Sequence, residues 1–292
     1  MAYIGHLDLV HVFERALRRA SLPVSMDESQ FHTRPRIRTA LPLPLGATSN
    51  AEIMEIELTR VMDLGEFKTK FAAELPPELP ILTIQTAPVQ RANGRIAESA
   101  TSLLDRVGWS LAFEMLPMET SGAADVTTGA NQEALEVSSE EMDQLNQDLE
   151  EVEALSSPPE GGAIGLPLPS ADEMRAELEA CVKGAMALTE CNVDKKTKRK
   201  QKRKTVDLRP NLHKLSASTA PQNSPVAGMY PPSAGTFVLH AEGSANQEAF
   251  LTPDAVRTLL ERGCGNRWRF ELRAVHRTLL TMKDPPPIPV EM

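Results

Sequence analysis

Aromatic residues and cysteines are scarce in this chain of 292 residues. Two Trp, two Tyr and eight Phe make up 4% of the sequence, so base-stacking platforms for single-stranded nucleic acids are poorly supplied. The three cysteines, Cys181, Cys191 and Cys264, are odd in number and widely spaced, which fits reduced thiols and matches no zinc or iron–sulfur spacing. We therefore expect no metal or other cofactor on this chain.

Long apolar runs are also missing. No stretch approaches the roughly 20 residues that a membrane helix needs. The first ten residues, MAYIGHLDLV, have neither the basic start of a secretory signal nor the Ser and Arg richness of an organelle transit peptide. These absences predict a soluble cytoplasmic protein with no membrane partner. An organelle location would follow if the true start lay upstream of Met1, because a targeting peptide would then be missing.

Positive charge is absent from one long segment and concentrated in a short one. Residues 119–170 contain twelve acids and no Lys or Arg, whereas residues 195–204 (KKTKRKQKRK) carry eight bases in a chain of net charge −9. Residues 117–169 also hold few bulky apolar side chains, so we predict a disordered acidic insertion there. This asymmetry points to an anionic partner for the basic part of the chain.

Hydrophobic periodicity in the N-terminal part predicts alternating strands and helices. The expected elements are a strand at or before 3–4, a helix at 6–20, strands at 36–41 and 52–58, a helix at 63–75 and a strand at 81–84. This order of strand, helix, strand, strand, helix, strand is the ferredoxin-like arrangement. We therefore assign residues 1–100 to a first ferredoxin-like domain whose first strand is truncated.

The same order is expected a second time, in 101–116 and 170–282. The predicted elements are a strand at 109–115, a helix at 172–188, strands in the basic stretch and at 205–208 that meet at a loop, a strand at 236–240, a helix at 252–262 and a strand at 268–280. Residues 216–233 are expected to form a flexible loop, and 283–292 a Pro-rich tail. The predicted fold class is thus α+β, with two ferredoxin-like (βαββαβ) domains in tandem.

Several short motifs, in order, carry a resemblance to a known family. They are YIGHLDL at 3–9, FERALRRASLP at 13–23, Phe31, Pro35, Ile37, ALPLPLG at 40–46, the basic residues 196–204, VDLRP at 206–210 and HRT at 276–278. Together they resemble the uncharacterised radical SAM-linked protein family, whose members lie fused behind, or encoded beside, cobalamin-binding radical SAM proteins. The resemblance implies a radical SAM protein as partner, and it places the iron–sulfur cluster, S-adenosylmethionine and cobalamin on that partner.

Two departures from the family pattern concern the N-terminal part. Residues 30–33 read QFHT where the family usually shows a Gly-Phe-Asn-Pro-type turn, which affects any site built on that turn. Residues that would supply a complete first strand would precede Tyr3, so the start looks clipped.

Arginines of the N-terminal part are the first candidate RNA-binding residues, because the planar guanidinium grips phosphate oxygens in pairs. They would form one phosphate-facing surface, near His6 at the start of the first helix, from Arg15, Arg18, Arg19, Arg34, Arg36 and Arg38. A structural interpretation competes with this one. Arginines in the last turn of a helix also stabilise the negative end of its dipole, and Asp8 favours the helix start.

The basic run is the second candidate, as a clamp on an RNA backbone whose binding would be salt-sensitive. Its bases are Lys195, Lys196, Lys198, Arg199, Lys200, Lys202, Arg203 and Lys204. A solvated hairpin tip or a localisation tag remains the alternative. Arg209 is either a further phosphate ligand or the partner of Asp207, and Arg277, beside His276, is a weaker RNA-binding candidate.

Three functional hypotheses follow. The first is a non-catalytic RNA-binding accessory module that works with a radical SAM enzyme, in tRNA or rRNA modification. The second is a metal-independent RNA-processing endonuclease with His6 or His32 at its site, since a histidine can act as a general base near neutral pH. The third is a protein–protein adaptor of a radical SAM enzyme. The sequence shows no nucleophile motif and no phosphate-binding glycine loop.

Overall fold

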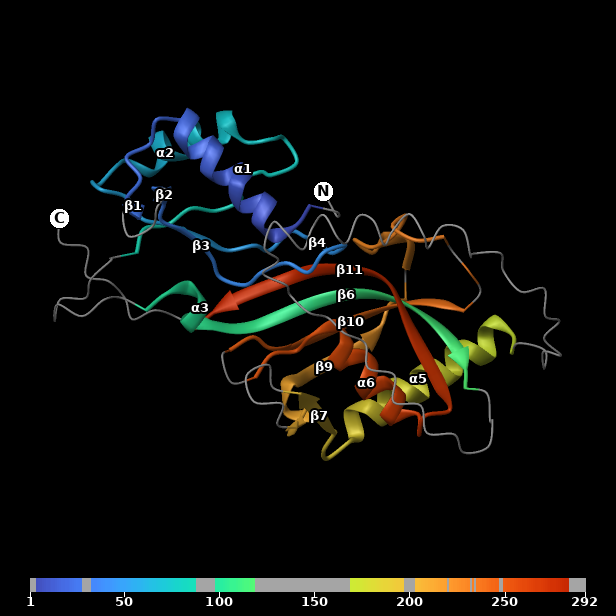
Figure 1. Cartoon of the computed structure of the whole chain (residues 1–292). Helices are drawn as coiled ribbons and strands as arrows, with labels where there is room; N and C mark the ends of the chain where they lie inside the picture. Colours follow the sequence, from blue (N-terminus) through green and yellow to red (C-terminus); the bar gives the residue numbers. More distant parts are fainter. Residues whose placement is uncertain are drawn as a thin grey trace, which may run out of the picture. The chain divides into compact units, whose positions relative to one another are not determined.

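The largest sheet among the described residues has five strands in this structure, a computed structural model (Figure 1). The structure describes residues 4–27, 33–87, 98–118, 169–196, 203–219, 221–231, 233, 235–246 and 249–283, with the backbone alone at 195–196 and 203–204. In spatial order the strands are β4 (Thr48–Ser49), β11 (Trp268–Met282), β6 (Leu104–Pro117), β10 (Thr236–Ser244) and β9 (Leu212–Ala217). Neighbouring strands are antiparallel except for β4, which pairs with β11 in parallel.

Two helices cover one face of this sheet, α5 (Ala171–Ala187) and α6 (Pro253–Gly263) (Figure 1). Side chains of β6 alternate between the faces, and Trp109, Leu111 and Phe113 point into the core beneath the helices. Helix α6 begins as its sequence predicts, because the Thr252 hydroxyl accepts a hydrogen bond from the Ala255 amide and Pro253 occupies the first turn.

Glycines bring the two helices unusually close. A Cβ atom on Gly184 of α5 would lie 2.1 Å from the carbonyl oxygen of Gly263, at the end of α6. No side chain fits at either position, so these glycines set the distance between the helices.

The C-terminal part follows the predicted element order. Strand β6, helix α5, strands β9 and β10, helix α6 and strand β11 succeed one another as strand, helix, strand, strand, helix, strand. The prediction assigns the wrong residues to the second strand of this sheet, however. Residues 203–207 form β8, which pairs with β7 (Asn192–Lys196) in a separate hairpin, while the sheet strand is β9.

Apart from β4, which joins the five-stranded sheet, the described strands of the N-terminal part form only two-stranded pairings. Strand β1 (Met26–Asp27) pairs with β2 (Arg34–Pro35), and β3 (Ile37–Thr39) with β5 (Met54–Ile56). Helices α1 (His6–Arg19) and α2 (Leu64–Glu74) pack over a small core of Ala16, Leu17, Phe67 and Phe71.

A first ferredoxin-like sheet is not confirmed. The predicted strand at 81–84 is irregular, although Ile81 and Ile84 still pack against the N-terminal core. The strand expected before residue 4 lies outside the described residues. The structure therefore has mixed α/β architecture without a confirmed tandem repeat, and the domain boundaries stay predictions.

The remaining segments differ from expectation in one respect. Residues 221–231, expected to be part of a flexible loop, contain a 3₁₀ turn at Pro221–Asn223 and bury Val226 completely against the sheet.

Two other short helices are α3 (Ala100–Leu103) and a 3₁₀ turn at Arg209–Asn211. Most of the acidic insertion (117–169) and of the tail (283–292) lies outside the described residues. Among the described helices, none is long and apolar enough to cross a membrane.

Candidate nucleic-acid interface

The β7–β8 hairpin that carries the basic run is anchored at its base. The Asp207 carboxylate accepts hydrogen bonds from the backbone amides of Cys191 (2.7 Å) and Arg209 (3.0 Å). Val193 and Val206, which face each other across the hairpin, pack against the main core. The base of the hairpin is therefore held in one place by both polar and apolar contacts.

The outer end of the hairpin places like charges opposite one another. The backbone register pairs Lys195 with Lys204, and Lys196 with Arg203. Directly opposed cations destabilise a strand pair unless an anion compensates them. The other four bases, Lys198, Arg199, Lys200 and Lys202, lie outside the described residues. Four described cationic positions thus gather on a hairpin whose acids, such as Asp194 and Asp207, lie toward its base.

Arg209 does not belong to this surface. Its guanidinium donates to the carbonyl oxygens of Met186 (2.8 Å), Leu188 (3.0 Å) and Leu212 (2.7 Å). Helix α5 ends at Ala187, so two of these are carbonyls that its last turn leaves without a helical partner. The Arg209 guanidinium is thus engaged within the protein, which argues against a phosphate contact. Asp207 is a partner of Arg209, as the alternative interpretation has it, but through the Arg209 backbone amide.

Arg277 is likewise internal, with none of its side chain exposed. Its Nη1 atom donates to both Glu52 carboxylate oxygens, at 2.8 and 2.9 Å, and its guanidinium also reaches the carbonyls of Leu41 and Pro42. The guanidinium lies over the Trp109 ring, 5.0 Å from its centre. Burial lowers the pKa of Arg277, although the Glu52 carboxylate acts against this change. The RNA-binding assignment of Arg277 is therefore wrong, because its charge is used inside the protein.

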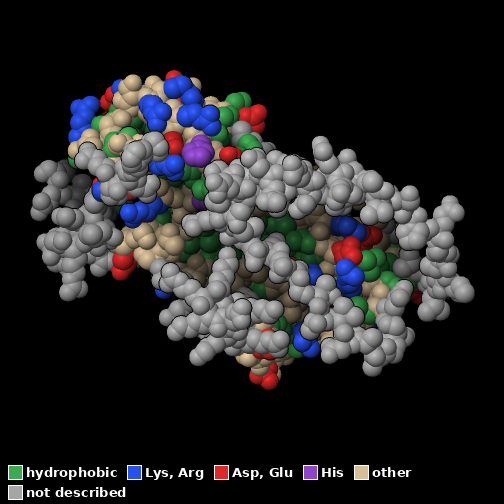
Figure 2. Space-filling model, viewed as in Figure 1, with side chains coloured by type: hydrophobic (Ala, Val, Ile, Leu, Met, Phe, Trp, Pro, Cys, Tyr) green, Lys and Arg blue, Asp and Glu red, His purple; other side chains and the backbone are tan. Residues whose placement is uncertain are grey.

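The six N-terminal arginines, by contrast, are all exposed. Figure 2 shows Lys and Arg side chains gathered on the visible face of the N-terminal part. Two of the six have acidic partners, since Arg19 pairs with Glu74 (2.7 Å) and Arg36 with Glu57 (3.3 Å). Exposed pairs of this kind are weak and exchange readily for another anion. A shallow groove of about 350 Å³ lies beside Arg15 and Arg19, between α1 and the end of α2.

The candidate histidines do not form a recognisable catalytic group. The His6 Nε2 atom lies 3.4 Å from the Thr39 hydroxyl, and His32 lies outside the described residues. Within the described ranges, no three His, Cys, Asp or Glu side chains cluster as metal ligands would. His6 therefore has a single hydroxyl beside its ring, and among the described residues no metal-binding group accompanies this pair.

The sheet face away from α5 and α6 carries a polar row that sequence reasoning missed. Thr48 of β4 lies opposite His276, His276 opposite Ser110, Ser110 opposite His240, and His240 opposite Ser216. We call these five residues the polar row. Only strand register brings them together, so no local sequence signal could have identified them.

Residues 221–231, which we call the covering segment, lie on this face. The Ser224 and Ser110 hydroxyls are 2.8 Å apart, and Val226 packs with Met229 and Tyr230 against Ala112 and its neighbours. The middle of the face is therefore occupied by the chain itself.

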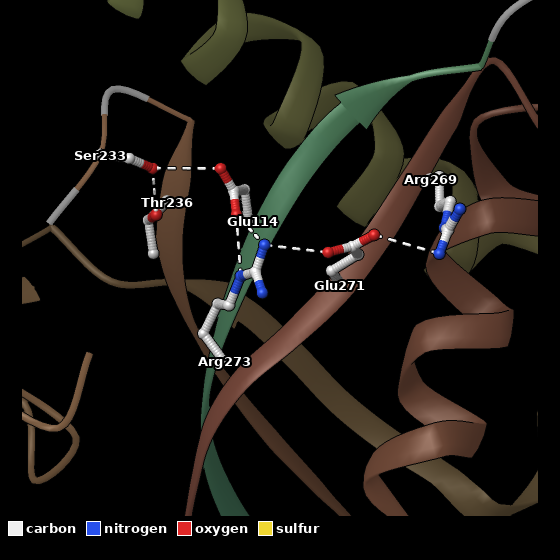
Figure 3. A network of polar contacts seen from close by, with 6 residues as sticks. All are labelled: Glu114, Ser233, Thr236, Arg269, Glu271 and Arg273. Atoms are coloured by element: carbon white, nitrogen blue, oxygen red, sulfur yellow. Dashed lines mark hydrogen bonds and ion pairs between the residues drawn. The ribbon is translucent and has the colours of Figure 1, made fainter. Parts of the chain in front are cut away.

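One end of the same face carries an ion network (Figure 3). Glu114 of β6 lies opposite Glu271 of β11, and Arg273 binds both carboxylates. Arg273 is the extra residue of a β-bulge, and Arg269 pairs with Glu271 at 3.0 Å. Because the charges compensate one another, this network links the two strands through ion pairs and does not form a free basic site.

Fold and site together define a mixed α/β protein with an anchored basic hairpin and no recognisable catalytic centre among its described residues. The chain belongs to the family described as "Uncharacterized protein conserved in bacteria (DUF2344)", whose model matches residues 1–249. No curated protein and no solved structure matches the chain.

Proposed function

We propose that this protein is a non-catalytic RNA-binding module that acts as an accessory to a radical SAM enzyme, in the modification of tRNA or rRNA. The observation that carries the proposal is the β7–β8 hairpin, whose register pairs cation with cation at its outer end. Phosphates of an RNA backbone would supply the missing negative charge, with release of counterions.

The anchoring of the hairpin supports this proposal. A tag of basic residues needs no fixed base, whereas this run begins and ends in strands that are tied to the core through Val193, Val206 and Asp207. A fixed base limits the positions that the bound phosphates can take. The exposed arginines of α1, β2 and β3 would extend the contact along the RNA.

The occupied sheet face argues for backbone recognition. The strand order β11-β6-β10-β9 is the ferredoxin-like order, from which we infer that class for 101–116 and 170–282. RNA-recognition modules of similar topology stack bases on aromatic side chains of the open face. Here the central positions of that face are Ser110 and Ala112, and the covering segment lies over them. Because bases cannot stack on this covered face, we infer that the protein recognises the charged phosphate backbone of the RNA.

The radical SAM partner enters the proposal only through the sequence motifs. In this scheme the partner carries the iron–sulfur cluster, S-adenosylmethionine and cobalamin, and our protein presents the RNA. The endonuclease and adaptor hypotheses remain as outcomes of the test below.

The test measures binding of labelled total tRNA to the full chain across a KCl series. The test variant replaces Lys195, Lys196, Arg203 and Lys204 by Gln, and the matched control replaces four exposed cations elsewhere: Arg60, Lys68, Arg175 and Lys183. If all four hairpin cations contact phosphates, the negative slope of log K against log salt becomes less steep by about 3 in the test variant. The control keeps the slope of the unmodified protein.

Two results would overturn the RNA-module proposal. Absence of tRNA binding at low salt would leave the adaptor hypothesis, which then requires capture of a protein partner. Cleavage of the tRNA that is lost in a His6→Ala or His32→Ala variant would replace the module by the endonuclease.

A further inference from the structure

His276 of β11 fastens two other segments to the sheet. Its Nδ1 atom lies 2.7 Å from the hydroxyl of Thr48, in β4, and the same hydroxyl donates to the Met229 sulfur (3.7 Å), in the covering segment. One imidazole therefore stands at the junction of the sheet, the short edge strand and the segment that covers the polar row.

The second ring nitrogen has no partner. His276 is only 8% exposed, and its Nε2 atom is buried without a hydrogen-bond partner among the described residues. If the single Thr48 hydroxyl proton is directed at Met229, Nδ1 carries the imidazole proton and Nε2 presents a bare lone pair, whereas a hydroxyl that donates to Nδ1 leaves the ring proton on Nε2. The tautomer that is protonated on Nε2 would bury an N–H group without an acceptor. The charged imidazolium also carries a proton on Nε2, so it would bury the same unsatisfied group.

Among the described residues, no acid is placed to compensate a charge at this position. The neighbours of His276 in the polar row are Thr48 and Ser110, and His240 lies one strand further. The covering segment contributes one titratable group, Tyr230, and β4 contributes none. The next residue on β11, Arg277, is a cation, and it is paired with Glu52 from the chain after β4. This carboxylate is therefore already compensated.

The ion network and the outer strands add no free acid. Glu114 and Glu271 are bound to Arg273, and Glu242 of β10 pairs with Lys214 of β9. Burial accordingly lowers the pKa of His276, and no carboxylate of the described residues opposes this change.

We propose that His276 is a proton-operated latch, which holds β4 and the covering segment against the sheet while it is neutral and releases both when it is protonated. Release would expose the polar row to solvent. Protonation favours the released state because the latched state would bury an imidazolium whose Nε2 proton has no acceptor.

The size of the effect follows from proton linkage. In the released state the solvated imidazole has a pKa of about 6.5, whereas burial lowers the pKa of the latched imidazole, and the largest effect is reached when the latched state binds no proton. Acidification from pH 7.5 to pH 5.5 then increases the population of the released state about tenfold.

Hydrogen exchange of the full chain, corrected for the intrinsic pH dependence, tests this latch. We expect protection at 47–50 and 224–231 to fall about tenfold between pH 7.5 and 5.5, while protection of α6 stays constant. His276→Asn keeps a donor near Thr48 but takes up no proton, so its protection does not change with pH. The matched control, His240→Asn, retains the response of the unmodified protein.

Equal protection of the unmodified protein at the two pH values would overturn the latch, as would an acid response that persists in His276→Asn. If that variant does not fold, nitrogen chemical shifts of the histidine rings decide the question in the unmodified protein. The latch requires a neutral His276 ring with its proton on Nδ1 at pH 7.5, and a charged ring under those conditions refutes it.

Discussion

Replacing Glu52 tests whether the buried charge of Arg277 is held in the way that its geometry implies. The Glu52→Gln variant keeps one acceptor oxygen but loses the carboxylate that takes two hydrogen bonds from Nη1. Hydrogen bonds to charged groups contribute about 1.5–3 kcal/mol each, so we expect unfolding to become easier by about 2–3 kcal/mol. Because Arg277 is fully buried, added salt should change this loss very little.

Removing the cation is expected to cost more. Arg277→Met leaves the carbonyls of Leu41 and Pro42 without their donors and leaves Glu52 without its cation, a loss of about 3–5 kcal/mol. The double variant loses one interaction rather than two. It should therefore be less destabilised than the sum of the single variants, by about 2 kcal/mol.

Urea unfolding of the full chain, followed by tryptophan fluorescence, measures these free energies. Trp109 lies directly under the guanidinium, so its signal reports on the same site. Additive effects of the two substitutions, within about 0.5 kcal/mol, would show that the residues do not interact and would refute the reasoning. If Arg277→Met does not fold, an unchanged stability of Glu52→Gln would refute it equally.

Two further predictions concern α5 and its contact with α6. Gly184→Ala should destabilise the protein by about 1–3 kcal/mol in urea unfolding, because its Cβ would meet the Gly263 carbonyl, whereas Lys183→Ala at the exposed neighbour stays within about 0.5 kcal/mol. A gain in stability from Gly184→Ala would contradict the close contact. Burial and the neighbouring Cys264 raise the pKa of the Cys181 thiol to about 12. Cys181 should therefore resist iodoacetamide at pH 8 until urea unfolds the chain. The free energy of unfolding should fall above pH 9, because there only the thiol of the unfolded chain ionises. Rapid labelling of the folded protein would contradict this.

Local patterns were sufficient for the helices and the long strands. Helix α1 ends at Arg19 and α6 begins after Thr252, close to the predicted limits, because dipole-favouring arginines and a threonine cap act within one turn. A hairpin at the basic run was also among the predictions, because the basic stretch and the residues after it were expected to form strands that meet at a loop.

Pairing across the chain could not be read from the sequence. The two residues of β4 form a strand only because β11 offers an open edge, and β9 takes the sheet position that was assigned to 205–208. The same holds for Arg277, whose partner Glu52 lies more than two hundred positions away. An arginine beside a histidine gives no sign of such a partner, so burial reversed its interpretation.

The motifs that carry the family resemblance are mostly those that build the fold. Asp207 and Arg209 close the base of the hairpin and the end of α5, and His276 and Arg277 fasten the chain around β4 to the sheet. These side chains are engaged with the protein itself. The resemblance is therefore evidence for a shared architecture more than for a shared binding site. A function that depends on contact with another molecule must use groups that the fold leaves outside. Among the candidates whose side chains are described, these are the exposed arginines of the N-terminal part, while the RNA contact of the basic hairpin stays a proposal.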